Sequence, residues 1–176
     1  MKENEIIEGE RICLRTATGE DTDLLVKWRN SPHIAKNFLR KEPLTREIHE
    51  NFRATEIAGG RAIQFIIVRK EDGKPIGSQY YLHIDPARQS AEFGIYIGEV
   101  TALGCGYGKE AAELAIRYAF KELRLREVLL RVREENQRAV SLYQNLGFSV
   151  CSETTVPDPE KDIRVLFMKK ENDGLK

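Results

Sequence analysis

The pattern of hydrophobic and polar positions along the chain predicts short strands and amphipathic helices. Residues 11–15 predict a first strand. Thr18 and Asp21 follow at the spacing of a capping box, and apolar residues then recur with helical periodicity, so we expect a helix to begin here. The helix is expected to end near Asn30, because Pro32 lacks the backbone N–H that a continuing helix needs.

A second helix is predicted after Thr45, whose hydroxyl can cap it. Ile48 and Phe52 recur at helical spacing, and Gly59 with Gly60 provides a stop signal. We therefore expect two helices between the first strand and the middle of the chain.

The middle of the chain predicts three antiparallel strands joined by tight turns. Branched residues dominate 62–68, a turn around Asp72-Gly73 leads to a strand over 75–82, and a turn at 85–88 leads to a strand over 90–98. In the last of these strands the apolar residues Ala91, Phe93, Ile95 and Ile97 alternate with Glu92, Gly94 and Tyr96. One face is expected to be buried, and the other presents a carboxylate.

The C-terminal part predicts further helices and strands in alternation. A glycine-rich turn, LGCGYGKEA, opens a long helix, a strand over 127–132 follows, Asn136 caps a shorter helix, and strands near 148–151 and 164–168 complete the pattern. The order of elements indicates an α+β fold within one domain over residues 1–176. Its layers surround a central mixed, mostly antiparallel sheet with helices on both faces.

Charge and composition exclude several classes of partner and location. Lys plus Arg equals Asp plus Glu at 28 each, so no overall positive field attracts DNA. The charged start and the absence of a long apolar run predict a cytoplasmic protein without a membrane span. Three widely spaced cysteines, Cys13, Cys105 and Cys151, argue against a disulfide framework, and neither they nor the three histidines have the spacing of a metal site.

The glycine turn has two interpretations. Gly104, Gly106 and Gly108 let the backbone approach a ligand closely, and the free N–H groups of the following helix, with Lys109 nearby, suit a pyrophosphate. The alternative is an ordinary connection between a strand and a helix. Gly106 to Ala111 also satisfies the G-x-G-x-x-A pattern of dinucleotide-binding folds, but antiparallel strands precede it here, whereas those folds place it after their first strand.

The core of the chain resembles the GNAT superfamily of acetyltransferases. The resemblance rests on SAEFGIYIG, LGCGYGKEAAELAIRYAF, VLLRV and ENQRAVSLYQNLGF, and it covers about residues 10–170. It implies direct transfer of acetyl from acetyl-CoA to a primary amine, without a metal, and it is compatible with a homodimer. Within the superfamily the chain looks most similar to the RimJ/RimL-type branch, which acetylates protein N-termini. One departure is Leu103, where the family usually has Arg or Gln.

Other identities of the acceptor stay open, including an amino sugar on a nucleotide, a polyamine and an aminoglycoside. Trp28-Arg29-Asn30, Thr45 and His49 also resemble acetyltransferases of nucleotide-linked amino sugars. A non-catalytic module that binds acyl-CoA is a further alternative, and it would need neither Glu92 nor Tyr143.

The resemblance also implies roles for individual residues. Glu92 is the candidate general base, with His83 as a weaker candidate, because a protonated amine cannot attack a thioester. Tyr143 matches the family position whose hydroxyl donates to the leaving sulfur, and Gly94 is expected to leave room for the substrate. A backbone N–H near Tyr96 or Ile97 is expected to stabilise the oxyanion. The residues expected to bind acetyl-CoA are Tyr96, Ile97, Gly104, Cys105, Gly106, Tyr107, Gly108, Lys109 and Asn136. A nucleophilic role for Cys105 is disfavoured, because no histidine lies near it in sequence.

Overall fold

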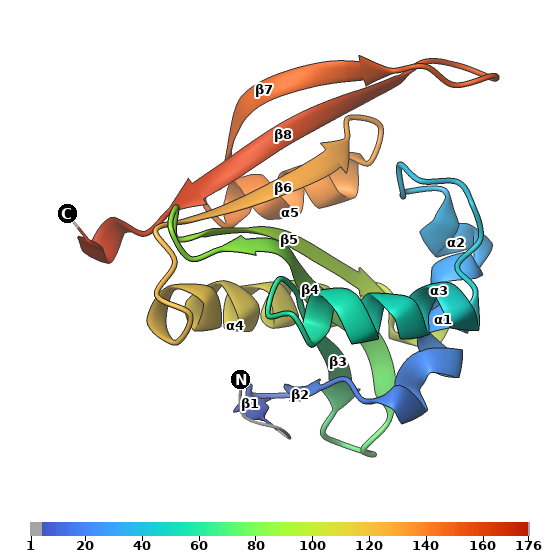
Figure 1. Ribbon diagram of the computed structural model, residues 1–176, viewed down its shortest axis with the longest axis vertical. Coiled ribbons are helices and arrows are strands. Elements are labelled where there is room, and N and C mark those ends of the chain that lie inside the picture. The colour runs from blue at the N-terminus through green and yellow to red at the C-terminus, as the bar shows by residue number, and fades with distance from the viewer. Residues whose placement is uncertain (1–4, 176) are drawn as a thin grey trace.

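An eight-stranded sheet organises the computed structural model, which describes residues 5–175 (Figure 1). The strands are β1 (Ile6–Glu8), β2 (Ile12–Thr16), β3 (Ile63–Arg69), β4 (Pro75–Asp85), β5 (Ser90–Ile97), β6 (Glu127–Arg133), β7 (Ser149–Val156) and β8 (Ile163–Glu171). The helices are α1 (Thr22–Asn30), α2 (Pro32–Ala35), α3 (Arg46–Phe52), α4 (Tyr107–Lys121) and α5 (Gln137–Asn145), with shorter helical turns at Gly19–Asp21, Arg53–Ile57, Val100–Ala102 and Asp173–Leu175.

The strand order is β1-β2-β3-β4-β5-β6-β8-β7. Among the described residues, β5 and β6 run parallel and every other neighbouring pair is antiparallel. The mixed, mostly antiparallel sheet predicted from the sequence is confirmed. Strand β1, which the hydrophobic pattern did not predict, adds an edge beside β2.

Two hydrophobic clusters, one on each face of the sheet, hold the helices in place. The larger cluster joins α4 and α5 to side chains such as Phe65, Tyr81 and Phe93. The smaller cluster joins Trp28 of α1 to Ile66 on the opposite face of β3. The alternation of Phe65 and Ile66 between the clusters follows from the pleat of a strand. Helices therefore cover both faces, as predicted.

The capping box at Thr18 and Asp21 forms as predicted, and it also receives a cation from β2. Arg15 donates to both carboxylate oxygens of Asp21, at 2.8 and 2.7 Å. Burial raises the pKa of the Asp21 carboxyl, but the hydrogen bonds from Arg15 and from the Thr18 N–H outweigh burial and lower that pKa. The helix that follows ends at Asn30, before Pro32.

Helix α3 begins after Thr45, whose hydroxyl accepts from the Ile48 N–H. The most buried side chain of this helix is polar. Ile48 is 39% exposed, whereas His49 is 3% exposed. The His49 ring contacts the Thr22 hydroxyl at 3.0 Å and the Gln64 amide oxygen at 3.1 Å, so a polar network replaces an apolar contact. Burial lowers the pKa of His49, which keeps the ring neutral.

The parallel junction between β5 and β6 is short. The pairing begins at Ser90 with Glu127 and ends at Glu92 with Leu129, although both strands continue beyond this point. The sheet is therefore open between the second halves of β5 and β6. None of the helices within residues 5–175 has the length and apolar character that crossing a membrane requires.

Candidate active site

The opening between β5 and β6 exposes backbone donors. The Gly98 N–H donates to the carbonyl of Ile76 in β4, at 2.8 Å. Because successive residues of a strand direct their N–H groups to opposite edges, Ile95 and Ile97 direct theirs toward β6. Tyr96 instead faces β4, so of the two positions predicted for the oxyanion it is Ile97 whose N–H is directed into the opening.

The glycine turn lies beside this end of β5. A Cβ added to Gly108 would lie 3.6 Å from Cγ1 of Ile97, which brings the start of α4 against the last residue of β5. Gly104 and Gly106 have φ of 78° and 83°, a left-handed conformation that favours glycine. The N–H groups of Gly104, Cys105 and Gly106 donate to no backbone acceptor within residues 5–175, and those of the first helical turn lack helical partners. The turn is thus a ready site for an anion.

Arg11, the residue immediately before β2, fixes the orientation of this turn. Its guanidinium donates to the carbonyl of Cys105 at 2.9 Å and lies 4.9 Å from the centre of the Tyr107 ring. The carbonyl of Cys105 and the N–H of Gly106 share one planar peptide group and point in opposite directions. The contact with Arg11 therefore turns the Gly106 N–H away from β2. Sequence reasoning missed Arg11, since no local pattern links β2 to a turn so far along the chain.

Glu110 joins the same contact from the first turn of α4. Its carboxylate accepts from the Arg11 side chain at 2.9 Å and from the backbone N–H groups of Arg11 and Ile12, at 2.7 and 3.2 Å. Burial raises the pKa of the Glu110 carboxyl, but these hydrogen bonds outweigh burial and lower it. Leu103, where the family usually has Arg or Gln, is 37% exposed. Arg11 thus brings a cation to a turn that lacks one at position 103.

Tyr143 projects from α5 toward β5. Its ring contacts Phe93 with centroids 6.2 Å apart and Phe148 at 5.8 Å, both in edge-on geometry. The residue is 7% exposed, and its hydroxyl makes no hydrogen bond to the described residues. Burial raises the pKa of the phenol, so it stays protonated across the physiological range. The arrangement leaves a hydroxyl donor available near the end of the parallel junction.

Glu92 occupies the last paired position of β5 and is not isolated. Its Oε1 atom accepts from Nε of Arg131 at 2.8 Å, and its Oε2 atom lies 3.1 Å from Nδ1 of His83. The Glu92 side chain is 20% exposed and that of His83 is 70% exposed. A carboxylate at the sheet junction is therefore connected through an imidazole to solvent. Arg131 was missed because its contact with Glu92 depends on the register of β5 and β6.

The predicted room beside Gly94 is occupied, which corrects one expectation. A Cβ at Gly94 would lie 2.2 Å from two ring carbons of Tyr80, the residue opposite on β4. Gly94 therefore makes room for the Tyr80 ring. Burial, and after it the nearby Glu92 carboxylate, raises the pKa of Tyr80 to about 12. Tyr80 also interacts electrostatically with Tyr143, so it neighbours both predicted catalytic residues.

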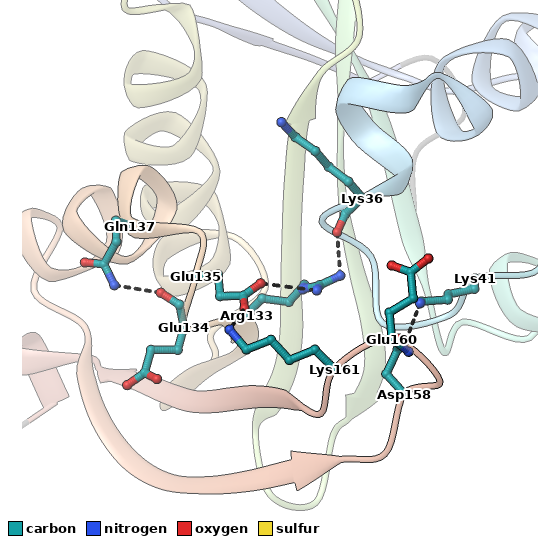
Figure 2. A network of polar contacts seen from close by, with 9 residues as sticks. All are labelled: Lys36, Lys41, Arg133, Glu134, Glu135, Gln137, Asp158, Glu160 and Lys161. Carbon is teal, nitrogen blue, oxygen red and sulfur yellow. Dashed lines mark hydrogen bonds and ion pairs between the residues drawn. The ribbon is translucent and has the colours of Figure 1, made fainter.

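A polar network joins the end of β6 to the segment after α2 and to the turn between β7 and β8 (Figure 2). Arg133, at the end of β6, donates to the carbonyl of Lys36 at 2.6 Å, and Lys41 forms an ion pair with Asp158 in the turn between β7 and β8. Three segments far apart in sequence are joined in this way. The same network also contains Glu134, Glu135, Gln137, Glu160 and Lys161.

Three other predicted residues have local roles in this structure. The Asn136 side chain accepts from the Ala139 N–H at 3.3 Å and so caps α5. The Lys109 ammonium lies 3.9 Å from Glu113 along the exposed side of α4. The Cys105 thiol is exposed and lies 3.6 Å from the carbonyl of Leu103.

Comparisons with known proteins show the family of this chain. A family model described as "Acetyltransferase (GNAT) domain" matches residues 11–149. The chain is 29% identical over 144 residues to the uncharacterized protein MJ1062 from Methanocaldococcus jannaschii, covering 80% of this chain but 28% of that protein's length. It is 26% identical over 151 residues to the acetyltransferase PseH from Campylobacter jejuni, covering 86% of this chain and 87% of the relative.

A solved structure shares the fold. The spermidine N-acetyltransferase from Vibrio cholerae, in complex with CoA and spermine, superposes with a TM-score of 0.84 at 23% identity, covering 92% of this chain and 95% of that chain. The GNAT-like fold predicted from the sequence is confirmed. Because the family model matches well over half of the residues, the chain belongs to the GNAT acetyltransferase family.

Proposed function

We propose that this chain transfers an acetyl group from acetyl-CoA to a primary amine by direct attack within a ternary complex. The observation that carries the proposal is the end of pairing between β5 and β6 at Glu92 and Leu129. The opening beyond it adjoins the glycine turn on one side and approaches Tyr143 on the other. An extended thioester arm fits there, with its pyrophosphate at the turn.

In this proposal the backbone holds the phosphates. The N–H groups of residues 104–109 donate to the pyrophosphate, and Arg11 keeps the Gly106 N–H turned toward it. Leucine at position 103 should weaken the affinity for acetyl-CoA more than it changes which cofactor binds, because the backbone donors do not depend on that side chain. Contacts of Lys109 and Asn136 with acetyl-CoA stay predictions.

Tyr143 is proposed to assist the departure of the CoA thiolate. Attack of the amine on the thioester carbonyl forms an oxyanion, which the Ile97 N–H stabilises. Collapse of this intermediate breaks the carbon–sulfur bond. The hydroxyl of Tyr143 then donates a hydrogen bond to the developing thiolate.

Glu92 is proposed to accept the proton that the amine loses. Arg131 occupies the Oε1 atom of Glu92, so the proton needs an outlet through Oε2. His83 provides that outlet, because one side of its ring contacts Glu92 and most of its side chain is in solvent. Tyr80, close to both Glu92 and Tyr143, lies where it can contact the amine.

The pH dependence of Glu92→Gln tests the role of this carboxylate. At pH values well below the pKa of the amine most of the acceptor is protonated, so we expect kcat/KM to fall about 10-fold near pH 7 and the loss to shrink as the pH approaches 10. The measurement is kcat/KM against pH for both proteins. If the two profiles have the same shape, Glu92 does not accept the proton.

Thermal melting with acetyl-CoA, NAD and ATP in parallel tests the choice of substrate. Ligand at about 100 times its Kd raises the free energy of unfolding by about 2.7 kcal/mol. For a chain of this size this is a shift in Tm of several degrees. We expect acetyl-CoA alone to give the shift, and release of CoA thiol on adding an amine separates an enzyme from a non-catalytic module. A shift with NAD alone contradicts the proposal.

Finer assignments stay predictions. The RimJ/RimL-type resemblance would make protein N-termini the acceptor, and the alternative is a nucleotide-linked amino sugar. The cytoplasmic location and the homodimer rest on sequence and family alone.

A further inference from the structure

Arg29 of α1 is a cation that has no acidic partner among the described residues. Its guanidinium stacks on Phe38 at 3.6 Å and donates to the carbonyl of Arg40 at 2.7 Å. Within residues 5–175 it contacts no carboxylate. Burial lowers the pKa of Arg29, which indicates a charge that its surroundings do not fully compensate. Stacking occupies the face of the guanidinium and leaves donors at its edge for a ligand.

The position of Arg29 links it to the proposed chemistry. The phenols of Tyr80 and Tyr96 are its electrostatic neighbours, and Phe38 contacts Tyr96 edge-on at 6.0 Å. Tyr80 is in turn a neighbour of Glu92 and Tyr143. Because Glu92 neutralises Arg131, Arg29 is an uncompensated positive charge beside Tyr80 and Tyr96.

The segment around Arg29 is also positively charged. Residues 24–41 contain Lys27, Arg29, Lys36, Arg40 and Lys41 and no Asp or Glu, although the whole chain is neutral. Lys41 is paired with Asp158 and Arg40 with Glu42, whereas the ammonium groups of Lys27 and Lys36 have no acidic partner in the described part of the chain. A polycation such as spermidine would meet like charge here, and an anion would meet complementary charge.

We propose that the acceptor is a primary amine that also carries a phosphate, and that Arg29 binds this phosphate. The inference rests on the proposed function and specifies its acceptor. A guanidinium edge binds phosphate through two parallel hydrogen bonds, which a lysine cannot reproduce. The amine and the phosphate would lie on either side of the Tyr80 ring.

Acceptors that differ by one phosphate test this inference. With saturating acetyl-CoA, kcat/KM is measured for glucosamine and glucosamine 6-phosphate, for ethanolamine and phosphoethanolamine, and for spermidine. We expect the phosphorylated member to exceed its neutral partner by about 10-fold in at least one pair. Arg29→Gln should lower kcat/KM about 10-fold for that acceptor and leave kcat/KM for its neutral partner unchanged. Arg29→Lys should lie between Arg29→Gln and the native protein. Arg117→Gln, which replaces an exposed arginine of α4 outside this segment, is the matched control and should change neither.

Salt provides a readout that a purely structural role would not move. Raising the ionic strength should increase KM for the phosphorylated amine and leave KM for its neutral partner constant. Spermidine turning over faster than every phosphorylated amine, or equal rates within every pair, would overturn the phosphate inference while leaving acetyl transfer intact. Release of CoA thiol with none of these amines, in a protein that acetyl-CoA still stabilises, would overturn the proposed function and this inference with it.

Discussion

Replacing Tyr143 with phenylalanine is expected to lower kcat by about 100-fold, because the variant loses the hydroxyl that donates to the leaving thiolate. The ring, its contacts with Phe93 and Phe148, and the backbone donors of the glycine turn are retained. Binding of acetyl-CoA should therefore be nearly unchanged. Steady-state release of CoA thiol gives kcat, and titration with acetyl-CoA gives the Kd.

Tyr118→Phe is the matched control for this variant. Tyr118 belongs to the same hydrophobic cluster, but its hydroxyl donates to Glu5 at 2.7 Å, at the β1 side of the sheet. Its loss should change Tm and leave kcat as it was. If Tyr143→Phe retains full turnover, or if both variants lose the same fraction of kcat, the hydroxyl of Tyr143 has no part in the reaction.

Adding one methyl group at position 94 is the second change for which we expect a large effect. In Gly94→Ala the new Cβ would overlap the Tyr80 ring at 2.2 Å, so the ring has to move away from Glu92 and Tyr143. A displacement of about 1 Å near reacting groups can cost about 100-fold in rate, and we expect a loss of this size in kcat/KM. The ring is half-buried at the edge of the opening, so the fold should persist with a modestly lower Tm.

The double variant Gly94→Ala with Tyr80→Ala separates displacement of the ring from damage to the strand. Removing the ring abolishes the overlap, so the double variant should match Tyr80→Ala alone in both kcat/KM and Tm. A single Gly94→Ala variant with native kcat/KM would mean that the position of Tyr80 does not matter for turnover. A double variant less active than Tyr80→Ala would place the defect in β5 itself.

Much of the fold could be predicted from local sequence patterns. The capping residues, the glycine stop signals and the alternation in β5 each concern residues that are neighbours in sequence, so the helices α1, α3, α4 and α5 and the strands β2 to β6 were predicted close to their observed limits. The burial of His49 in α3 was not predicted, because hydrophobicity alone cannot anticipate that Thr22 and Gln64 supply partners for this ring. Strand β1 is three residues long and too short to show a period.

The candidate site divides in the same way. The glycine turn, Tyr143 and Glu92 lie within recognisable motifs. Tyr80, Arg11 and Arg131 do not, because each acquires its role from a contact across the sheet or between β2 and α4. Strand register decides such contacts, and register depends on how the whole sheet assembles.

The short parallel junction also sets an order of assembly. The strands from β3 to β5 form an antiparallel meander, and β7 with β8 forms a hairpin, so these pairings join segments close in the chain. Ser90 can pair with Glu127 only after α4 has been accommodated between them. Closing a long loop costs entropy before its contacts form, which makes such pairings late events in folding. A chain still emerging from the ribosome would therefore lack the crevice that accepts acetyl-CoA, and this crevice would be among the last features to form.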